Sequence, residues 1–472
     1  MTRIFTPFVI LLLTLCNICP QTSFGQADWT VMVYMNGDNN LEQDALDNFR
    51  DMAKIGSSDK LNIIVQFDRI GKYGHTYPDW TQTLRFKVAK GMEPLPAQAV
   101  EDIGEANMGD QKTLQDFVAW SMKQYPAKHY MLDIWDHGSG YRLMLASGAT
   151  RQKIQKILDA VNPMDKAANV HELTYLSSAP HHNKIAFATG DPFRSSTGSP
   201  YRSCSNDETN NDELYNREIE DGLKGALGGG KIDVIGFDCC LMAMIETAYA
   251  LRSVGSVMVG SEELEPGAGW QYDDWLQGLA TNTSINGQQL GQLLVDSYKK
   301  AYGNIHIDPT TTMAALDLGK VPDAATAISQ LADALTKQMA SNWSTIKTIR
   351  GSCSNFAPDY SDPNPFYHVD ILHFCQLVKQ KVQNAIIQTA VDNTINLVSG
   401  MIIANYAGVA RQGNFGGTGM AIYFPPSGNA YKLDAYAKNG YEKNNNFYPV
   451  EFVKNELWSD FLHIYFKYVP QN

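Results

Sequence analysis

Near the middle of the chain stands the stretch Ile232-Asp233-Val234-Ile235-Gly236-Phe237-Asp238-Cys239-Cys240-Leu241-Met242. Its first six residues form a short apolar run rich in β-branched side chains, which is typical of a buried strand. Residues 241–251 then have the spacing of a helix. The stretch therefore predicts a strand that passes through two adjacent thiols into a helix, with Cys240 at the start of that helix.

Other strands and helices flank this stretch on both sides. Strands are expected at 29–35, 61–67, 129–135 and 257–260, and helices at 41–54 and 113–125. Such an alternation predicts an α/β fold, a mostly parallel sheet with helices on its faces. Because sites in open sheets of this kind form at the carboxyl ends of the strands, the residues that follow two strands, His137 and Cys240, are candidates for a common site.

A cysteine where a strand turns into a helix is placed for nucleophilic chemistry. The unpaired N–H groups and partial positive charge of a helix N-terminus stabilise a thiolate, which attacks acyl groups. Backbone N–H groups there can also hold an oxyanion. A thiolate that cleaves peptides needs an imidazole as acid and base, and His137, followed by Gly138-Ser139-Gly140, is the candidate.

Other interpretations of these residues stay open at this point. Cys240 can be a buried, inert thiol, and His137 can be a structural loop residue. A metal site at His129, Asp133 and His137 is an alternative, although two large apolar residues would crowd that face of the strand. Asp238 either caps the expected helix or lines a pocket as a buried carboxylate matched to a basic substrate side chain.

Between the two candidate residues lies an insertion at about 143–211. Residues 151–161 have helical spacing, whereas 189–211 are rich in Gly, Ser, Pro and Asn without an apolar period, which is typical of an exposed loop. Later in the chain, helices are expected at 287–302, 323–339 and 378–398, and strands at 311–318 and 418–424. We expect a catalytic domain at 26–281 and a C-terminal α/β subdomain at 282–472.

The N-terminus resembles a secretory signal peptide over residues 1–25. An apolar run follows Arg3, and the small residues Ser23 and Gly25 precede a plausible cleavage point. The run is too short for a membrane span, and neither Cys16 nor Cys19 follows a small residue, so no lipid anchor is expected. The chain should be exported, either secreted or periplasmic. The net charge of −12 argues against a nucleic-acid partner, which needs a basic stripe.

The seven cysteines leave an odd number after the expected cleavage. The mature chain would retain five cysteines: Cys204, Cys239, Cys240, Cys353 and Cys375. These cannot all pair within one chain, so at least one free thiol is expected.

Several of these segments together resemble the clostripain family of cysteine peptidases, which shares the caspase-like fold. They are the strand that ends Asp-His-Gly-Ser-Gly at 136–140, the strand that ends Gly-Phe-Asp-x-Cys-Leu-Met at 236–242, the first strand with 38–41, residues 261–270, and 419–425. The resemblance implies a caspase-like sheet with a C-terminal α/β extension. It implies that Cys240 is the nucleophile, that His137 is the acid and base, and that Asp238 lines the S1 pocket and favours Arg or Lys. Cys239 stands where the family usually has Ala, and the stretch between His137 and Cys240 is longer than usual.

The expected function is therefore an exported cysteine endopeptidase that cleaves proteins or peptides after Arg or Lys. Relatives mature by cleavage between the catalytic residues, so a self-processed, two-chain form is expected, with Arg194 or Arg202 as the cut site. No cofactor should be required. Some relatives need Ca²⁺, and Asp207-Glu208 is a candidate for binding it, although the spacing is not that of a calcium loop. The alternatives are an inactive binding protein on the same scaffold and a metal-dependent hydrolase.

Overall fold

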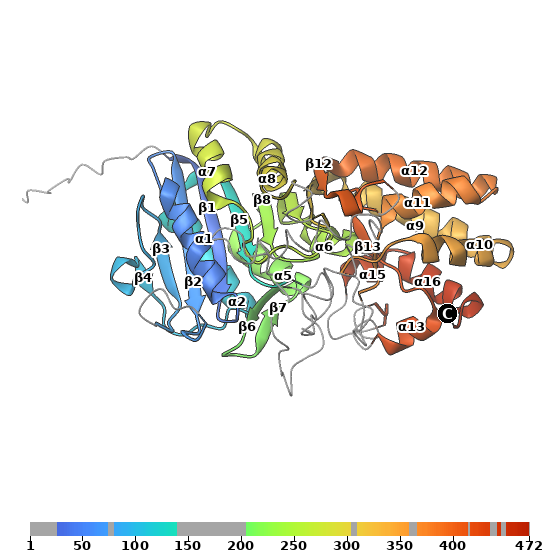
Figure 1. Ribbon diagram of the computed structural model, residues 1–472, viewed down its shortest axis with the longest axis horizontal. Helices are drawn as coiled ribbons and strands as arrows, with labels where there is room; N and C mark the ends of the chain where they lie inside the picture. The colour runs from blue at the N-terminus through green and yellow to red at the C-terminus, as the bar shows by residue number, and fades with distance from the viewer. Residues whose placement is uncertain are drawn as a thin grey trace, which may run out of the picture.

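A large sheet forms the centre of the molecule in the computed structural model (Figure 1). The structure describes residues 26–73, 80–138, 204–303, 309–357, 366–413, 416–434, 441–444 and 450–471. Within these ranges the sheet has nine strands in the order β12-β10-β9-β8-β5-β1-β2-β3-β4. The strands are β1 Ala27–Gly37, β2 Leu61–Arg69, β3 Leu84–Lys87, β4 Glu101–Asp102, β5 Ala127–Trp135, β8 Ile232–Asp238, β9 Gly255–Gly260, β10 Thr312–Asp317 and β12 Ile402–Ala407.

The five central strands, β9, β8, β5, β1 and β2, run parallel, and antiparallel strands complete both edges. Strand β2 is buried along its whole length, because helices cover both faces of the sheet. Two small two-stranded sheets stand apart from the large one: the hairpin of β6 Cys204–Asp207 with β7 Asp212–Leu214, and β11 His368–Asp370 paired with β13 Ala421–Tyr423 from further along the chain.

The helices form layers on the two faces of the sheet and a further helical body beside it (Figure 1). On one face α1 Glu42–Ile55, α7 Tyr272–Thr281 and α8 Gly287–Tyr302 contact one another, and on the other α2 Gln111–Gln124, α5 Asn216–Leu227 and α6 Ile245–Leu251 do so. The further body contains α9 Val321–Lys337, α10 Met339–Ser352, α11 Ile371–Lys381, α12 Ala385–Met401, α13 Gly428–Leu433, α15 Glu451–Asn455 and α16 Trp458–Tyr468. Helix α9 joins this body to the sheet by packing on α6.

The strand register aligns three carboxyl ends at one edge of the sheet. Met35 of β1 lies opposite Trp135 of β5, which in turn lies opposite Asp238 of β8. Because the strands are parallel, the residues two positions further on, His137 and Cys240, leave the sheet side by side. The expectation of a mostly parallel sheet with helices on its faces is confirmed.

The helix after the two thiols begins later than the sequence predicted. Leu241 has a φ of 67°, a left-handed conformation that a helix cannot contain. Met244 is extended and forms an isolated parallel bridge with Ala421, so α6 begins only at Ile245. The expectation that Cys240 lies at a helix N-terminus is therefore wrong.

Two further expectations are corrected. The final residues of the expected exposed loop form the β6–β7 hairpin, in which Ser205 and Asn211 have positive φ values of 59° and 50°. The helix expected at 378–398 is two helices, α11 and α12, because Val382 is extended and Asn384 caps α12 by accepting bonds from the N–H groups of residues 386 and 387. Strands β10 and β12, which follow the expected boundary at 281, continue the same sheet.

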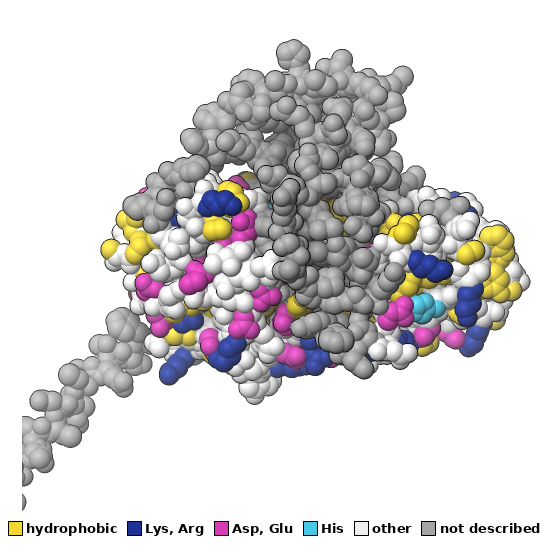
Figure 2. All heavy atoms as spheres, turned by 90° about the horizontal axis from the view of Figure 1, so that it is seen from below, with side chains coloured by type: hydrophobic (Ala, Val, Ile, Leu, Met, Phe, Trp, Pro, Cys, Tyr) yellow, Lys and Arg dark blue, Asp and Glu magenta, His cyan; other side chains and the backbone are white. Residues whose placement is uncertain are grey.

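The surface carries both signs of charge. Figure 2 shows acidic and basic side chains interspersed over the described part of one face, with hydrophobic groups at both ends. Of the helices in the described ranges, none is long and apolar enough to cross a membrane. The proposed signal peptide, the helix expected at 151–161, Arg194 and Arg202 lie outside the described residues.

Candidate active site

His137 and Cys240 meet through direct backbone packing. A methyl group on Gly138 would lie 2.3 Å from the carbonyl oxygen and 2.7 Å from the nitrogen of Cys240, so only glycine allows this approach. The N–H of Asp136 also donates to the carbonyl of Asp238, at 3.3 Å. The two turns that the sequence singled out are thus brought together, and both His137 and Cys240 are buried.

Asn40 orients the imidazole of His137. The amide Oδ1 of Asn40 lies 2.9 Å from Nε2 of His137. Because this oxygen can only accept, Nε2 carries the hydrogen in this contact, and Nδ1 is the basic nitrogen of that tautomer. Asn40 belongs to the loop between β1 and α1, which the sequence analysis treated only as a turn.

Asp136 ties the histidine turn to two other segments. Its buried carboxylate accepts bonds from the side-chain amides of Asn36 and Asn39 and from the backbone N–H groups of Asn206 and His137. Asn36 lies near the end of β1 and Asn39 in the loop that follows it, whereas Asn206 belongs to β6, the first described strand after the insertion. Burial raises the pKa of Asp136 well above its ordinary value, and the hydrogen bonds from His137, Asn206 and Asn39 partly offset this rise.

The thiol of Cys240 receives a backbone donor that does not come from its own helix. The N–H of Glu265 lies 3.2 Å from Sγ of Cys240. An N–H directed at the sulfur stabilises the thiolate, which is the role that the sequence analysis gave to the N-terminus of the following helix. The segment after β9 therefore supplies the donor that α6, which begins at Ile245, cannot supply.

The neighbouring thiol of Cys239 faces a different partner. Its Sγ lies 2.9 Å from Sγ of Cys204, the first residue of β6. Burial raises the pKa of both thiols, so neither favours the thiolate. All five cysteines of the described chain are buried and form no disulfide. The odd number of cysteines predicted at least one such free thiol. The structure thus separates the two adjacent thiols into different surroundings.

Asp238 lies in a buried group of acidic side chains rather than at a helix cap. Its carboxylate accepts bonds at 3.0 Å from the backbone N–H of Trp270 and from the hydroxyl of Tyr272, and that hydroxyl also donates to Asp133 at 2.6 Å. Burial and the charge of Asp133 raise the pKa of Asp238 well above its ordinary value. Since α6 begins at Ile245, the capping role proposed for Asp238 is wrong.

Glu265 adds a third carboxylate to this group. The indole of Trp270 donates to its Oε2 at 3.1 Å, while Oε1 is buried without a hydrogen-bond partner. Burial raises the pKa of Asp133 to about 7, and burial together with the charge of Asp238 raises that of Glu265 well above its ordinary value. Across the described ranges no lysine, arginine or histidine forms an ion pair with Asp133, Asp238 or Glu265.

Residues of the alternative metal site are not brought together. Nδ1 of His129 lies 2.9 Å from Oδ1 of Asp233, and its ring stacks on Trp29. Asp133 bonds to Tyr272 instead.

Sequence reasoning gave no role to three residues of the site: Asn40, Asp136 and Glu265. Each contributes through a loop whose path depends on the assembled sheet. The polar residues at 36–40, at the end of a buried strand, were the one signal that pointed to Asn40.

Comparisons with known proteins identify a family and solved structures that the chain is similar to. The model of the clostripain family matches residues 33–155 and 154–465. The chain is 24% identical over 450 residues to clostripain of Hathewaya histolytica, covering 85% of this chain and 75% of that protein. Its fold is similar to a secreted C11 cysteine protease from Bacteroides thetaiotaomicron, iotapain, with a TM-score of 0.57, 14% identity, and coverage of 93% and 100% of the two chains.

An inactive zymogen C11 protease from Parabacteroides distasonis is also similar in fold. Its TM-score is 0.52 at 15% identity, with 88% of this chain and 98% of that chain covered. The expected caspase-like architecture is confirmed by these solved folds together with the observed sheet.

Proposed function

Because the chain belongs to the clostripain family of cysteine peptidases, we propose that it is an exported endopeptidase that cleaves after arginine or lysine with Cys240 and His137. The observation that carries this proposal is the group of buried carboxylates beside Cys240. Asp133, Asp238 and Glu265 lie there without a cationic partner among the described residues. A buried carboxylate without a positive partner is costly, and the side chain of a basic substrate residue supplies that partner.

The proposed reaction is acyl transfer through a thioester. The thiolate of Cys240 attacks the scissile carbonyl, and His137 gives a proton to the leaving amine, which departs as the new N-terminus. His137 then takes a proton from water, which attacks the thioester and frees the thiol and the new carboxylate. Asn40, through its 2.9 Å contact with Nε2, would keep Nδ1 as the nitrogen that exchanges these protons.

Replacing Asp238 by asparagine should remove most of the preference for basic P1 residues. The amide keeps the size of the side chain and one acceptor for Trp270 or Tyr272, but loses the charge that a guanidinium would pair with. A charge-assisted bond contributes about 1.5–3 kcal/mol, so kcat/KM for an arginine substrate should fall about 10- to 100-fold. Turnover of fluorogenic peptides varied at P1 measures this.

Asp333→Asn is the matched control, because Asp333 lies on α9 and pairs with Lys337 at the surface. It should leave the whole P1 profile unchanged. Preferential cleavage by the wild type after aspartate, asparagine or apolar residues would contradict the assigned specificity.

The proposal of export rests on the leader at residues 1–25 and on the resemblance to proteases described as secreted. An inactive binding protein on the same scaffold is disfavoured, because His137, Cys240 and Asp238 are all retained.

We also propose that the enzyme is made as a precursor that cuts itself between His137 and Cys240. The intervening chain is rich in Gly, Ser and Pro, and holds Arg194 and Arg202, which suit the proposed P1 preference. The resulting two chains would remain together, since β5 and β8 from either side of the cut are neighbours in one sheet.

N-terminal sequencing of the purified protein should reveal a new terminus after Arg194 or Arg202. In Cys240→Ala the same preparation should give one unbroken chain. A wild-type enzyme that is fully active as a single chain would refute self-processing. A fragment that persists in Cys240→Ala would point to another protease.

A further inference from the structure

Two thiols that take no part in the proposed reaction contact each other beside the active site. They belong to Cys204, the first residue of β6, and to Cys239, which directly follows β8. Their Sγ atoms lie 2.9 Å apart, and both residues are buried. Since an S–S bond is about 2.05 Å long, a small movement of the two side chains brings the sulfurs to bonding distance. The pair is therefore placed to form a disulfide.

Backbone packing holds the two cysteines at this distance. Cys204 forms an isolated antiparallel bridge with Gly138. On its other side Gly138 packs against the turn of the adjacent thiols, because a methyl group on it would lie 3.0 Å from the carbonyl carbon of Cys239. The contact between the sulfurs therefore depends on the main chain of both segments, and not only on two side-chain rotamers.

The same arrangement leaves the nucleophile out of the pair. Cys240 follows Cys239 directly, and adjacent cysteines are badly placed to bond to each other. The Sγ of Cys240 instead accepts the N–H of Glu265 at 3.2 Å. The remaining two cysteines of the described chain belong to the helical body beyond the sheet, at the end of α10 and within α11. A bond between Cys204 and Cys239 thus uses two of the five thiols and keeps Cys240 free for catalysis.

We propose that Cys204 and Cys239 form a disulfide in the exported enzyme, which holds the start of β6 against the catalytic turns. Disulfides form and persist in the oxidising surroundings outside the cytosol. The inference therefore rests on the export proposed above, but it does not depend on peptidase activity.

The bond would form by thiol–disulfide exchange, with a small-molecule or protein disulfide as the oxidant. The thiolate of one cysteine attacks a sulfur of that oxidant, forms a mixed disulfide and releases one thiolate. The thiolate of the other cysteine then attacks the sulfur of its partner, which closes the bond and releases the second thiolate. The two cysteines lose two protons, and two electrons reduce the oxidant. Since burial raises the pKa of both thiols in the folded chain, this exchange belongs to the stage of folding before β6 is packed.

The disulfide would matter most after the proposed self-cleavage. Both candidate cut sites precede Cys204, so a cut leaves β6 close to a new chain end. Chain ends fray unless they are tied down. Strand β6 supplies the N–H of Asn206 to the carboxylate of Asp136, which also accepts the N–H of His137. A bond at the first residue of β6 therefore preserves the histidine turn in the two-chain form, and the two sulfurs act by positioning without touching substrate.

Peptide mapping tests whether the bond forms. The full chain carrying Cys240→Ala, which does not digest itself, is refolded with a mixture of oxidised and reduced glutathione, alkylated without reduction and cut with trypsin. Residues 203–217 should be recovered linked to residues 232–252, in which Cys239 is then the only cysteine. Alkylation of both Cys204 and Cys239 would overturn the proposal, and so would a link from either of them to another cysteine. Because the oxidation is carried out in vitro, a negative result would not reflect a failure of export or of catalysis.

Thermal unfolding of the same chain measures what the bond contributes. A cross-link between residues this far apart restricts the unfolded chain, so the oxidised chain should have a Tm about 3 °C or more above that of the chain refolded with a reductant throughout. With Cys204→Ala added, the two preparations should have the same Tm. Cys353→Ala, which removes a buried thiol outside the pair, is the matched control and should keep the full difference.

Equal Tm values for the oxidised and reduced parent chain would overturn the stabilising role, as would a difference that persists in the Cys204→Ala chain. In the wild-type enzyme after self-cleavage, the difference should be larger than in the unbroken Cys240→Ala chain. An equal or smaller difference there would contradict the tethering of the cut end.

Discussion

Cys240→Ala should abolish peptidase activity, whereas Cys239→Ala should leave most of it. Only the sulfur of Cys240 accepts a bond from the N–H of Glu265, a contact that favours the thiolate. The sulfur of Cys239 faces Cys204 instead, and burial raises its pKa well above the ordinary value. Values of kcat/KM on an arginine substrate, together with mass mapping of an arginyl chloromethyl ketone adduct, distinguish the two thiols.

Cys375→Ala is the control for the loss of a buried thiol, since Cys375 lies in α11, in the helical body beyond the sheet. It should retain activity and carry the adduct on Cys240. The assignment of the nucleophile would be wrong if Cys239→Ala were inactive and Cys240→Ala active, or if the adduct mapped to Cys239.

The sheet could be predicted from the sequence because its strands are short apolar runs. Burial on both faces leaves little room for polar residues, so β1, β2, β5 and β8 all stand out from the segments around them. The rule that sites form at the carboxyl ends of parallel strands then pointed to His137 and Cys240, although 102 residues separate them. The observed register places both residues at one edge of the sheet.

The details of the site depended on backbone conformations that the side chains do not reveal. The apolar spacing after Cys240 is compatible with a helix, yet Leu241 adopts a left-handed conformation and Met244 pairs with Ala421, far along the chain. Tertiary contacts thus override a local preference for helix. The same contacts determine that Glu265, and not α6, provides the donor to the sulfur of Cys240.

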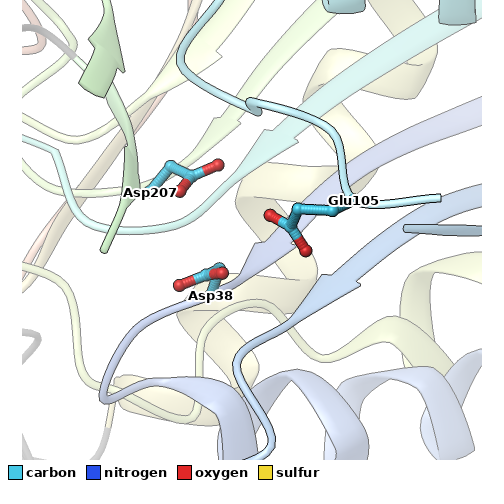
Figure 3. A group of neighbouring side chains, drawn as sticks. All are labelled: Asp38, Glu105 and Asp207. Carbon is cyan, nitrogen blue, oxygen red and sulfur yellow. The ribbon is translucent and has the colours of Figure 1, made fainter. Parts of the chain in front are cut away.

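A second group of acidic side chains could not be found from sequence spacing for a related reason. Asp38 and Glu105 lie in separate loops and Asp207 ends β6, and no calcium-loop pattern connects the three carboxylates, which lie within 4.8 Å of one another (Figure 3). Asp207 was noticed as part of an acidic pair with Glu208, but Glu208 lies 3.6 Å from Lys72 and outside the group. The conformation of the β6–β7 hairpin directs Asp207 toward Asp38 and Glu105, and Glu208 away from them. The sequence predicted only an exposed loop in this segment.

His137→Ala should lower kcat by about 10²- to 10⁴-fold, the usual contribution of general acid–base catalysis. The reason is that both the departure of the amine and the hydrolysis of the thioester need a group that exchanges a proton near neutral pH. Asn40→Ala should have a smaller effect in the same direction, because it removes the acceptor 2.9 Å from Nε2 and leaves the imidazole in place. Single-turnover rates with an arginine substrate measure the two effects on the chemical step.

The control is His129→Ala. His129 is a half-buried histidine on β5, the strand that precedes His137, and it pairs with Asp233, so its loss should leave kcat near the wild-type value. The dependence of kcat on pH distinguishes a catalytic role of His137 from a purely structural one. In His137→Ala, the rise of kcat that accompanies the ionisation of an imidazole should be absent. In Asn40→Ala, that rise should remain, with its midpoint shifted. A His137→Ala enzyme with near-normal kcat would rule out the role, because no second imidazole in the described chain lies at the carboxyl end of β5, beside Cys240, to replace it.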